Sequence, residues 1–308
     1  MSSRTAGKSA ARERVEAMRA AQVAKQKRQR LLAAVVAIAL VLLVVGGFVV
    51  AKAAGVGSGT DSASTTTASG AAPAKVVDAV TKVPAATLDA VGVGSAQAAP
   101  RAIKAPALTA DGKPRVLYVG ADYCPFCAAE RWPVVVALSR FGTWSDLGVT
   151  ESSSSDVFPN TPSLSFHGAS YASDYLSFTG VETAKSEKVN GQYPPLDELS
   201  AADQKTFDTY NRPPYTAGTA GGIPFLNLAG QYVSSGASYP PDVLKGKSRA
   251  QIAAALADPT NDVSKAVNGS ANVITAALCE VTNGQTTTVC TSPGVKAAAA
   301  ALATSQRQ

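Results

Sequence analysis

The residues of this chain best suited to chemistry are two cysteines with two residues between them, in Cys124-Pro-Phe-Cys127. An apolar, β-branched run, Val116 to Val119, precedes them, and an apolar segment with helical spacing follows from Ala128. This order predicts a strand, a dithiol and a helix in direct succession. Thiols with this spacing at a helix N-terminus can close a small disulfide ring, and the free backbone N–H groups there favour the thiolate of the first. We therefore expect a redox-active dithiol in which Cys124 attacks and Cys127 resolves.

Other uses of the same spacing fit the chain less well. A structural zinc site usually takes four Cys or His ligands, whereas this chain has one His, and its other cysteines, Cys279 and Cys290, are spaced too far apart. A haem attachment requires His directly after the second cysteine, where Ala128 stands. The single histidine, His167, is more typical of a packed or exposed residue than of a partner for Cys124. We expect neither a metal nor another cofactor.

A longer string around the dithiol resembles a known family. It comprises Gly112-Lys-Pro114, the residues from Tyr118 to Trp132, and Ala137-Leu-Ser-Arg-Phe-Gly142. The dithiol segment resembles the thioredoxin superfamily, and the longer string is similar to the thioredoxin-like proteins of the domain of unknown function 929 family, whose members are largely uncharacterised. This resemblance implies an α/β, thioredoxin-like fold, with a central mixed β-sheet flanked by helices, and it implies thiol–disulfide chemistry.

A second informative segment runs from Gly221 to Leu228 and has a proline at the start of an apolar run. Proline is poorly tolerated inside a central strand, and Ala229-Gly230 predicts a hairpin turn after the run. In the thioredoxin superfamily a cis-proline opens the strand that faces the dithiol. The resemblance therefore implies that the Ile223–Pro224 bond is cis and that both residues line a substrate groove beside Cys124.

The residues around the two cysteines set the expected redox character. Pro125 stands at the first helical position, where no backbone donor is needed, and Phe126 carries no positive charge; we expect both to line the substrate groove. Oxidising members of the superfamily often have a His at the second place, and thioredoxins have a buried acid roughly where Tyr118 stands, so the sequence does not favour a strong oxidant. Asp122 and Glu130 are the candidate proton acceptors, although each is more often a surface carboxylate.

Charge and hydropathy divide the N-terminal region into two parts. The first 30 residues carry nine Lys and Arg against two Glu, whereas the whole chain has a net charge of +6, so the remainder is nearly neutral. The uncharged segment from Leu31 to Ala51 has about the ~20 residues that a helix needs to cross a bilayer. Because Lys and Arg stay on the cytoplasmic side of such helices, we expect a basic cytoplasmic tail at 1–30, a transmembrane helix at 31–52 and an extracytoplasmic remainder.

The alternative to an anchor is a signal peptide cleaved near Ala51-Lys-Ala-Ala54. The length of the apolar segment and the long charged stretch before it favour an uncleaved anchor in the cell membrane, with a single pass. The basic tail is typical of a solvated helical face with affinity for anionic lipid. We expect the lipid bilayer, and not nucleic acid, as its partner.

Beyond the anchor, composition predicts a linker, one domain and a short tail. Residues 53–75 are rich in Gly, Ser, Thr and Ala and lack the apolar side chains needed for order. The thioredoxin-like domain is expected at 76–291, with a polar, Pro-rich insertion at about 184–219. Helices are predicted at 128–141, 247–257 and 262–281, the last with a weak point at Asn268-Gly269. The Ala-rich residues 292–308 are expected to form a C-terminal tail.

All four cysteines follow the predicted anchor, where disulfides are permitted. Of the three possible connectivities, the local one pairs Cys124 with Cys127 and Cys279 with Cys290, the second pair being structural. The other two connectivities, which join the dithiol to the C-terminal pair, stay open as minor alternatives.

Two classes of function remain. The first is a membrane-anchored extracytoplasmic thiol–disulfide oxidoreductase that acts on protein disulfides; its partners are substrate proteins with thiols or disulfides, and a membrane redox partner. The second is a non-enzymatic thioredoxin-fold module for binding or redox sensing, in which the dithiol forms a structural disulfide. The direction of electron flow stays open.

Overall fold

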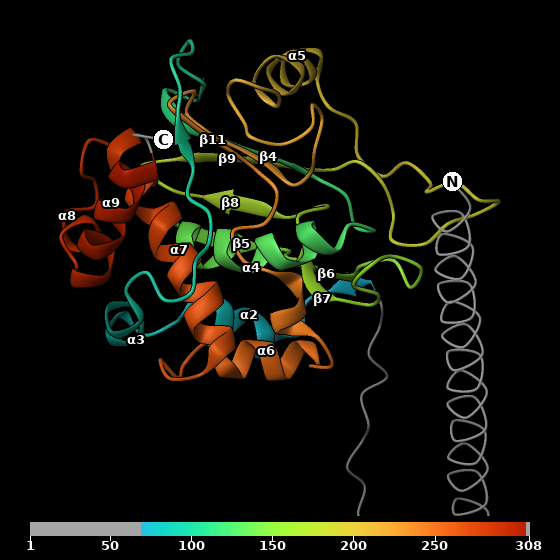
Figure 1. Cartoon of the computed structure of the whole chain (residues 1–308), viewed down its shortest axis with the longest axis horizontal. Helices are drawn as coiled ribbons and strands as arrows, with labels where there is room; N and C mark the ends of the chain where they lie inside the picture. Colours follow the sequence, from blue (N-terminus) through green and yellow to red (C-terminus); the bar gives the residue numbers. More distant parts are fainter. Residues whose placement is uncertain (1–68, 306–308) are drawn as a thin grey trace, which may run out of the picture. The chain divides into compact units, whose positions relative to one another are not determined.

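The computed structural model describes residues 69–305 (Figure 1). The expected cytoplasmic tail, the expected transmembrane helix and most of the expected linker lie outside the described residues. Within residues 69–305 we found no helix with both the length and the apolar character needed to cross a membrane. The described residues belong to one unit by their contacts, a mixed α/β arrangement built around a central sheet.

The central sheet is mixed, with strand β4 at its middle. β4 pairs in parallel with β9 and antiparallel with β10, which in turn pairs antiparallel with β11. Short strands β2 and β3 extend the sheet beside β11 and β4. The strands are β2 (Arg101–Ala102), β3 (Thr109–Ala110), β4 (Lys113–Gly120), β9 (Ser177–Glu182), β10 (Phe225–Leu228) and β11 (Tyr232–Ser235).

Two smaller antiparallel sheets complete the β-structure. One has the order β1-β6-β7, and the other pairs β5 with β8. Their strands are β1 (Gly70–Ala71), β5 (Thr143–Ser145), β6 (Gly148–Glu151), β7 (Pro162–Ser165) and β8 (Ser170–Ala172). Because β1 pairs with β6, ordered structure begins inside the region 53–75 that composition assigns to a linker, and the expected domain boundary at 76 is too late.

Side chains of β4 alternate between two apolar clusters on opposite faces of the sheet, as the two-residue period of a strand requires. Val116 and Tyr118 belong to the larger cluster, and Leu117 and Val119 to the smaller one. Figure 1 shows α5 on one side of the sheet and α4 with α7 on the other. β4 is therefore buried on both faces of the sheet. This burial holds in place the end of the strand, from which the turn to Cys124 begins.

The helices confirm most of the sequence expectations and sharpen their limits. α4 begins at Pro125 and ends at Leu138, α6 begins after a capping box at Ser248, and α7 covers 262–281. The helices are α2 (Ala74–Thr81), α3 (Ala85–Val91), α4 (Pro125–Leu138), α5 (Ala201–Tyr210), α6 (Arg249–Ala255), α7 (Asp262–Val281), α8 (Thr287–Cys290) and α9 (Pro293–Ser305), with a 3₁₀ turn η1 (Pro241–Leu244).

The segment expected as an insertion, 184–219, packs against the sheet. Its helix α5 places the ring of Phe207 edge-on to that of Phe225, with 5.5 Å between the ring centroids, and Asp203 forms an ion pair with Arg115 of β4. The smaller apolar cluster is thus closed partly by this segment.

The C-terminal residues correct the expectation of a tail. α9 packs against α7 and α3, and Val295, Ala298 and Leu302 are buried. A disulfide bond between Cys279 and Cys290 holds α8 against the end of α7. Its small alanine side chains let α9 lie close to α7 and α3, so tertiary packing orders the segment.

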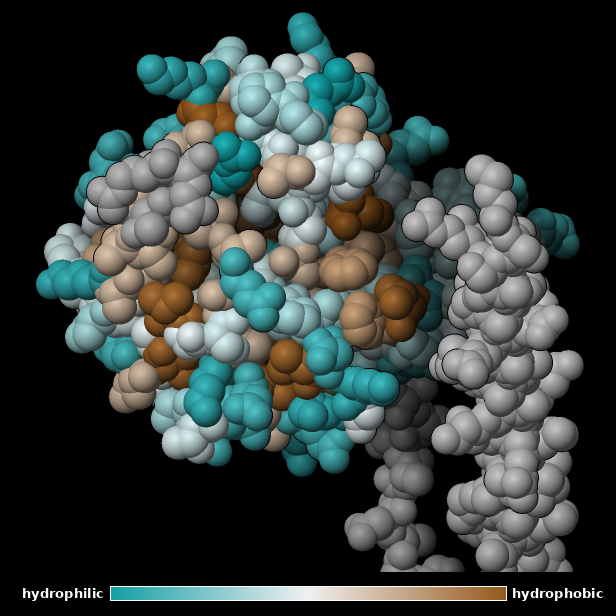
Figure 2. Space-filling model, in the orientation of Figure 1, coloured by the Kyte–Doolittle hydropathy of each residue, from teal (hydrophilic) through white to brown (hydrophobic). Residues whose placement is uncertain are grey.

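The surface seen in Figure 2 mixes hydrophilic and hydrophobic residues, and its apolar areas are separate spots between hydrophilic side chains. This pattern is ordinary for a folded domain, since much of any protein surface is apolar.

The sequence predicts a weak point in the helix at Asn268-Gly269, but α7 is continuous there. Gly269 instead allows the backbone at Val93 to approach the helix closely. A Cβ at this position would lie 2.2 Å from the carbonyl oxygen of Val93, which is far inside van der Waals contact. We expect Gly269→Ala to lower the free energy of unfolding by about 1–3 kcal/mol, since overpacking outweighs the gain in helix propensity.

The measurement is urea unfolding of Gly269→Ala beside Gly218→Ala, because a Cβ at Gly218 meets no atom within 4 Å. Equal stability of the two variants and the parent would contradict the close contact between α7 and Val93.

Candidate functional site

The dithiol lies where β4 delivers the chain to α4. After β4 ends at Gly120, a short turn leads to Cys124, which is the N-cap of α4, and Pro125 takes the first helical position. The backbone N–H of Cys127 donates a hydrogen bond to Cys124 Sγ over 3.3 Å. Both cysteines are free thiols; Cys124 is 6% exposed and Cys127 is fully buried. The first thiol is therefore the one closer to solvent.

The surroundings separate the acidities of the two thiols. A hydrogen bond from Cys127 lowers the pKa of Cys124 below its ordinary value; burial opposes this, while the Cys127 backbone N–H and the charge of Arg131 support it. Burial raises the pKa of Cys127 well above its ordinary value, and the hydrogen bond with Cys124 adds to the effect. Cys124 is therefore the thiol that ionises more readily, and Cys127 is the one that keeps its proton.

The start of β10 lies against the dithiol. The Ile223–Pro224 peptide bond is cis, and Cys124 Sγ donates a weak hydrogen bond to the carbonyl oxygen of Ile223 over 3.8 Å. The structure thus brings these three residues together, although 99 positions separate Cys124 from Ile223.

Exposed apolar side chains stand at Phe126, between the two cysteines, and on two nearby loops. Among residues 69–305 the exposed large hydrophobic residues are Phe126 (40%), Val157 (68%) and Val189 (59%). The ring of Phe126 meets that of Phe158 edge-on, with centroids 5.9 Å apart, and the loop of Val189 is tied by Glu187 to Ser154. We call Phe126, Val157, Phe158 and Val189 the apolar rim. Pro125, the other expected groove residue, is buried.

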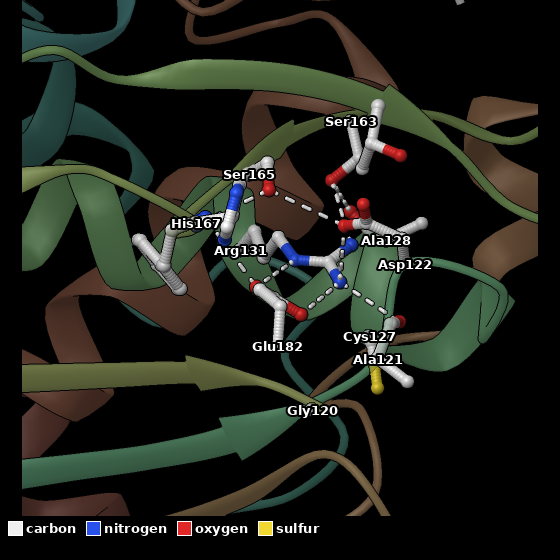
Figure 3. A network of polar contacts seen from close by, with 12 residues as sticks. Gly120, Ala121, Asp122, Cys127, Ala128, Arg131, Ser163, Ser165, His167 and Glu182 are labelled. Atoms are coloured by element: carbon white, nitrogen blue, oxygen red, sulfur yellow. Dashed lines mark hydrogen bonds and ion pairs between the residues drawn. The ribbon is translucent and has the colours of Figure 1, made fainter. Parts of the chain in front are cut away.

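Beneath the dithiol lies a buried ionic network, drawn in Figure 3. Arg131 of α4 has no exposed side-chain surface, and its Nε and Nη2 donate to the two carboxylate oxygens of Glu182 over 2.8 and 2.6 Å. Nη2 also donates to the carbonyl oxygen of Ala121 over 2.8 Å. Sequence reasoning missed this pair. The available signal was an arginine four residues after Cys127, on the same face of a predicted apolar helix.

The two candidate proton acceptors are both buried, which corrects the alternative of a surface position. Asp122 lies within the network, with Oδ1 3.6 Å from Arg131 Nη2 and accepting a hydrogen bond from Ser165. Glu130 Oε2 accepts hydrogen bonds from the backbone N–H and the hydroxyl of Ser238, over 2.7 and 2.6 Å. Burial raises the pKa of Glu130 to about 7, although both bonds from Ser238 oppose the shift.

Glu130 also lines a cavity of about 390 Å³ together with Thr216, Ser235 and Gly236. Gly236 N–H donates to the carbonyl oxygen of Pro224, which ties the wall of this cavity to the residue before β10. A carboxyl group that ionises near neutral pH and faces a cavity can exchange protons with solvent.

His167 lies at the exposed edge of the network in Figure 3. Its side chain is half exposed and pairs with Asp197 over 2.6 Å, and its backbone N–H donates to Ser165 Oγ, which donates to Asp122. Cys279 and Cys290 are bonded to each other, so the connectivities that join them to the dithiol do not occur in this structure. Within the described part of the chain no cluster of three or more His, Cys, Asp and Glu side chains is suited to hold a metal ion.

The separation of the two thiols predicts a selective alkylation. At neutral pH iodoacetamide should modify Cys124 of the reduced, folded protein and leave Cys127 unmodified, because only Cys124 has a lowered pKa and access to solvent. Peptide mass spectrometry over a pH series measures both rates, with glutathione in the same samples as the reference thiol. Unfolding in urea should make the two rates equal. Equal rates in the folded protein would contradict the asymmetry.

Glu130 predicts a pH-dependent stability. Its carboxyl group binds a proton more tightly in the folded protein, with a pKa of about 7, than in the unfolded chain, near 4.5. The free energy of unfolding therefore falls by roughly 3 kcal/mol as the pH rises from 4.5 through 7. Glu130→Gln still accepts both hydrogen bonds from Ser238 but does not ionise, so its unfolding free energy should fall less between pH 5 and pH 8.

Urea unfolding at the two pH values measures this difference, and Glu280→Gln, at an exposed position of α7, is the matched control. A pH dependence of Glu130→Gln identical to that of the parent would show that Glu130 is ionised throughout.

Comparison with known proteins gives one match. A family model described as Domain of unknown function (DUF929) matches residues 101–280, more than half of the chain, and this range includes the dithiol, Arg131, Glu182 and Pro224. Neither the comparison with curated proteins nor the comparison with solved structures found a match. On the extent of the family match, the chain belongs to the DUF929 family.

Proposed function

We propose that this protein is a membrane-anchored, extracytoplasmic thiol–disulfide oxidoreductase that acts on protein disulfides through Cys124 and Cys127. The observation that carries the proposal is the asymmetry of the two thiols at the start of α4. One has a lowered pKa and some access to solvent, and the other is fully buried with a raised pKa. A structural disulfide has no need of such a difference, whereas stepwise exchange uses it.

The proposed fold is thioredoxin-like. Three observations support it: a central mixed sheet, a dithiol between the end of β4 and the start of α4, and a cis Ile223–Pro224 bond beside Cys124. The backbone at Ile223 is held against Cys124, which favours it as the place where a substrate backbone would lie.

The proposed reaction is a reversible exchange in two steps. The Cys124 thiolate attacks one sulfur of a substrate disulfide, a Cys124–substrate bond forms, and the first substrate sulfur leaves and takes up a proton. Cys127 then loses its proton and attacks Cys124 Sγ, which releases the second substrate thiol and forms the Cys124–Cys127 disulfide. The substrate is reduced by two electrons and the dithiol is oxidised by two. The reverse sequence oxidises substrate thiols, and the relative reduction potentials decide the direction.

The second step needs an acceptor for the Cys127 proton, and Glu130 is the better of the two candidates. It lies three residues after Cys127 on α4, which places both on neighbouring positions of the helix. Its pKa of about 7 matches an acceptor that works near neutral pH. The carboxylate of Asp122 is already engaged with Arg131 and Ser165.

Two further observations support the substrate class and the compartment. The apolar rim favours polypeptide substrates with apolar side chains beside the reacting cysteine, since exposed hydrophobic residues at a site mark contact surfaces. The Cys279–Cys290 disulfide favours an oxidising, extracytoplasmic compartment. The membrane anchor at 31–52 rests on its sequence, together with the basic residues before it.

One observation favours the second candidate, a binding or redox-sensing module. Cys124 is only 6% exposed, so little of its sulfur is open to a substrate disulfide. A structural or sensing disulfide does not need that access.

Trapping of mixed disulfides separates the two candidates. In intact membranes, full-length Cys127→Ser should accumulate mixed disulfides through Cys124, because the resolving thiol is missing. Non-reducing gels and mass spectrometry of the captured proteins measure this, and Cys124→Ser is the matched control, which should capture none.

Absence of adducts in Cys127→Ser, with Cys124 still open to alkylation, would exclude the oxidoreductase and support the sensing module. Captured proteins would identify both the substrates and the enzyme that recycles the dithiol.

A further inference from the structure

The pair formed by Arg131 and Glu182 is fully removed from solvent. Neither side chain has exposed surface, and the two are joined by two short hydrogen bonds in a fork-to-fork arrangement. Arg131 comes from α4, one turn after Cys127, and Glu182 ends β9 beside Gly120. The pair therefore links the helix that carries the dithiol to the strand beside β4.

The guanidinium of Arg131 is fixed beneath the turn that leads into the dithiol. Besides Glu182, it donates to the carbonyl oxygen of Ala121 over 2.8 Å and contacts Ser163 Oγ at 3.4 Å. Ser163 in turn donates to the carbonyl oxygen of Ala128. These contacts fix the guanidinium beside the backbone of Ala121, with Cys127 nearby in Figure 3.

The titratable groups that face Arg131 come from several elements. They are Glu182 of β9, Asp122 of the turn, Tyr118 of β4, and the two thiols at the start of α4, whereas β7 offers only the hydroxyl of Ser163. Tyr118 stays neutral, because burial raises its pKa well above its ordinary value. For the Cys127 sulfur, the positive charge of Arg131 lowers the pKa by more than the negative charge of Glu182 raises it.

Stability alone is a weak reason for such a pair. Taking two charges out of water costs several kcal/mol each, and replacing buried ion pairs by apolar residues is often neutral or stabilising. A fixed positive charge near a thiol, however, stabilises the thiolate. Only the reduced dithiol has a thiolate to stabilise, so the charge acts on one side of the redox equilibrium.

We propose that Arg131, held in place by Glu182, shifts the redox equilibrium of the Cys124–Cys127 pair toward the reduced form. The inference rests on the proposed function, and it adds the direction that the site favours. The Cys124–Cys127 disulfide accepts two electrons and two protons from two substrate thiols, which become a disulfide. Arg131 thereby supplies the positive charge that Cys-Pro-Phe-Cys lacks, and it favours oxidation of substrates. Arg131 does not contact the substrate, and it acts only through its charge on the sulfurs of Cys124 and Cys127.

Two variants should shift the equilibrium in opposite directions. Glu182→Gln keeps an acceptor for Arg131 and removes the opposing negative charge, so the equilibrium with glutathione should move about threefold toward the reduced dithiol. Arg131→Met combined with Glu182→Met removes both charges with little change of volume. It should move the equilibrium about tenfold toward the disulfide, which corresponds to about 30 mV.

The measurement uses the full-length protein in detergent, equilibrated with mixtures of reduced and oxidised glutathione. Alkylation and mass spectrometry of the peptide that holds Cys124 and Cys127 give the fraction reduced. The Cys279–Cys290 pair in the same samples is an internal control and should not shift. The pH midpoint of Cys124 alkylation should fall in Glu182→Gln and rise in the double variant.

Shifts of both variants in the same direction, or no shift, would overturn the proposal and leave the pair a structural one. Should Glu182→Gln fail to fold, because it leaves the buried Arg131 without its anionic partner, the double variant decides alone: a shift toward the disulfide supports the proposal, and no shift overturns it. These measurements need no substrate protein, so they stay separate from the trapping experiment on which the proposed function depends.

Discussion

Helix α4 is buried along its whole length except at Phe126, and the removal of water from around it governs each ionisable group that it carries. Without contact with water, a side chain stays charged only where a partner offsets the free energy lost on desolvation. Cys127 and Glu130 lack a cationic partner of their own, and burial raises the pKa of both. Arg131 keeps its charge because Glu182 accompanies it. The pKa of Cys124 is lowered instead, first by the hydrogen bond from the Cys127 side chain and then by the backbone N–H groups that face its sulfur at the N-cap.

The burial depends on elements that hold α4 from several sides. Two of its early carbonyl groups accept hydrogen bonds from outside the helix: that of Ala128 from Ser163, and that of Ala129 from the Tyr239 hydroxyl. The Ala129 carbonyl has no helical donor, because Pro133 has no N–H. The indole of Trp132 donates to the carbonyl oxygen of Pro162. Strand β7 and the segment after β11 are therefore tied to the helix just beyond the dithiol, and the geometry of the site follows from that packing.

Three acids lie around α4, and their partners give them different roles. Glu182 and Asp122 face the guanidinium of Arg131 and stay with it, whereas Glu130 has only the neutral Ser238. The first two offset a buried charge, and the third ionises near neutral pH beside a cavity. Neighbouring positions of α4 thus carry one charge with a fixed partner, Arg131, and one carboxyl group with a pKa near neutral, Glu130.

The sequence by itself determined the local features of this protein, because strand and helix periods, caps and cysteine spacing are properties of neighbouring residues. The dithiol between a strand and a helix, the proline that opens β10 and the capped helix α6 were predictable in this way. The tertiary structure alone decided which groups lose contact with water. Arg131 meets Glu182 across 51 positions, Glu130 meets Ser238 across 108, and the alanines of α9 find their helices only when the domain packs. Burial and ion pairing join segments that are distant in the sequence. They leave no periodic pattern among neighbouring residues, so the sequence alone does not predict them.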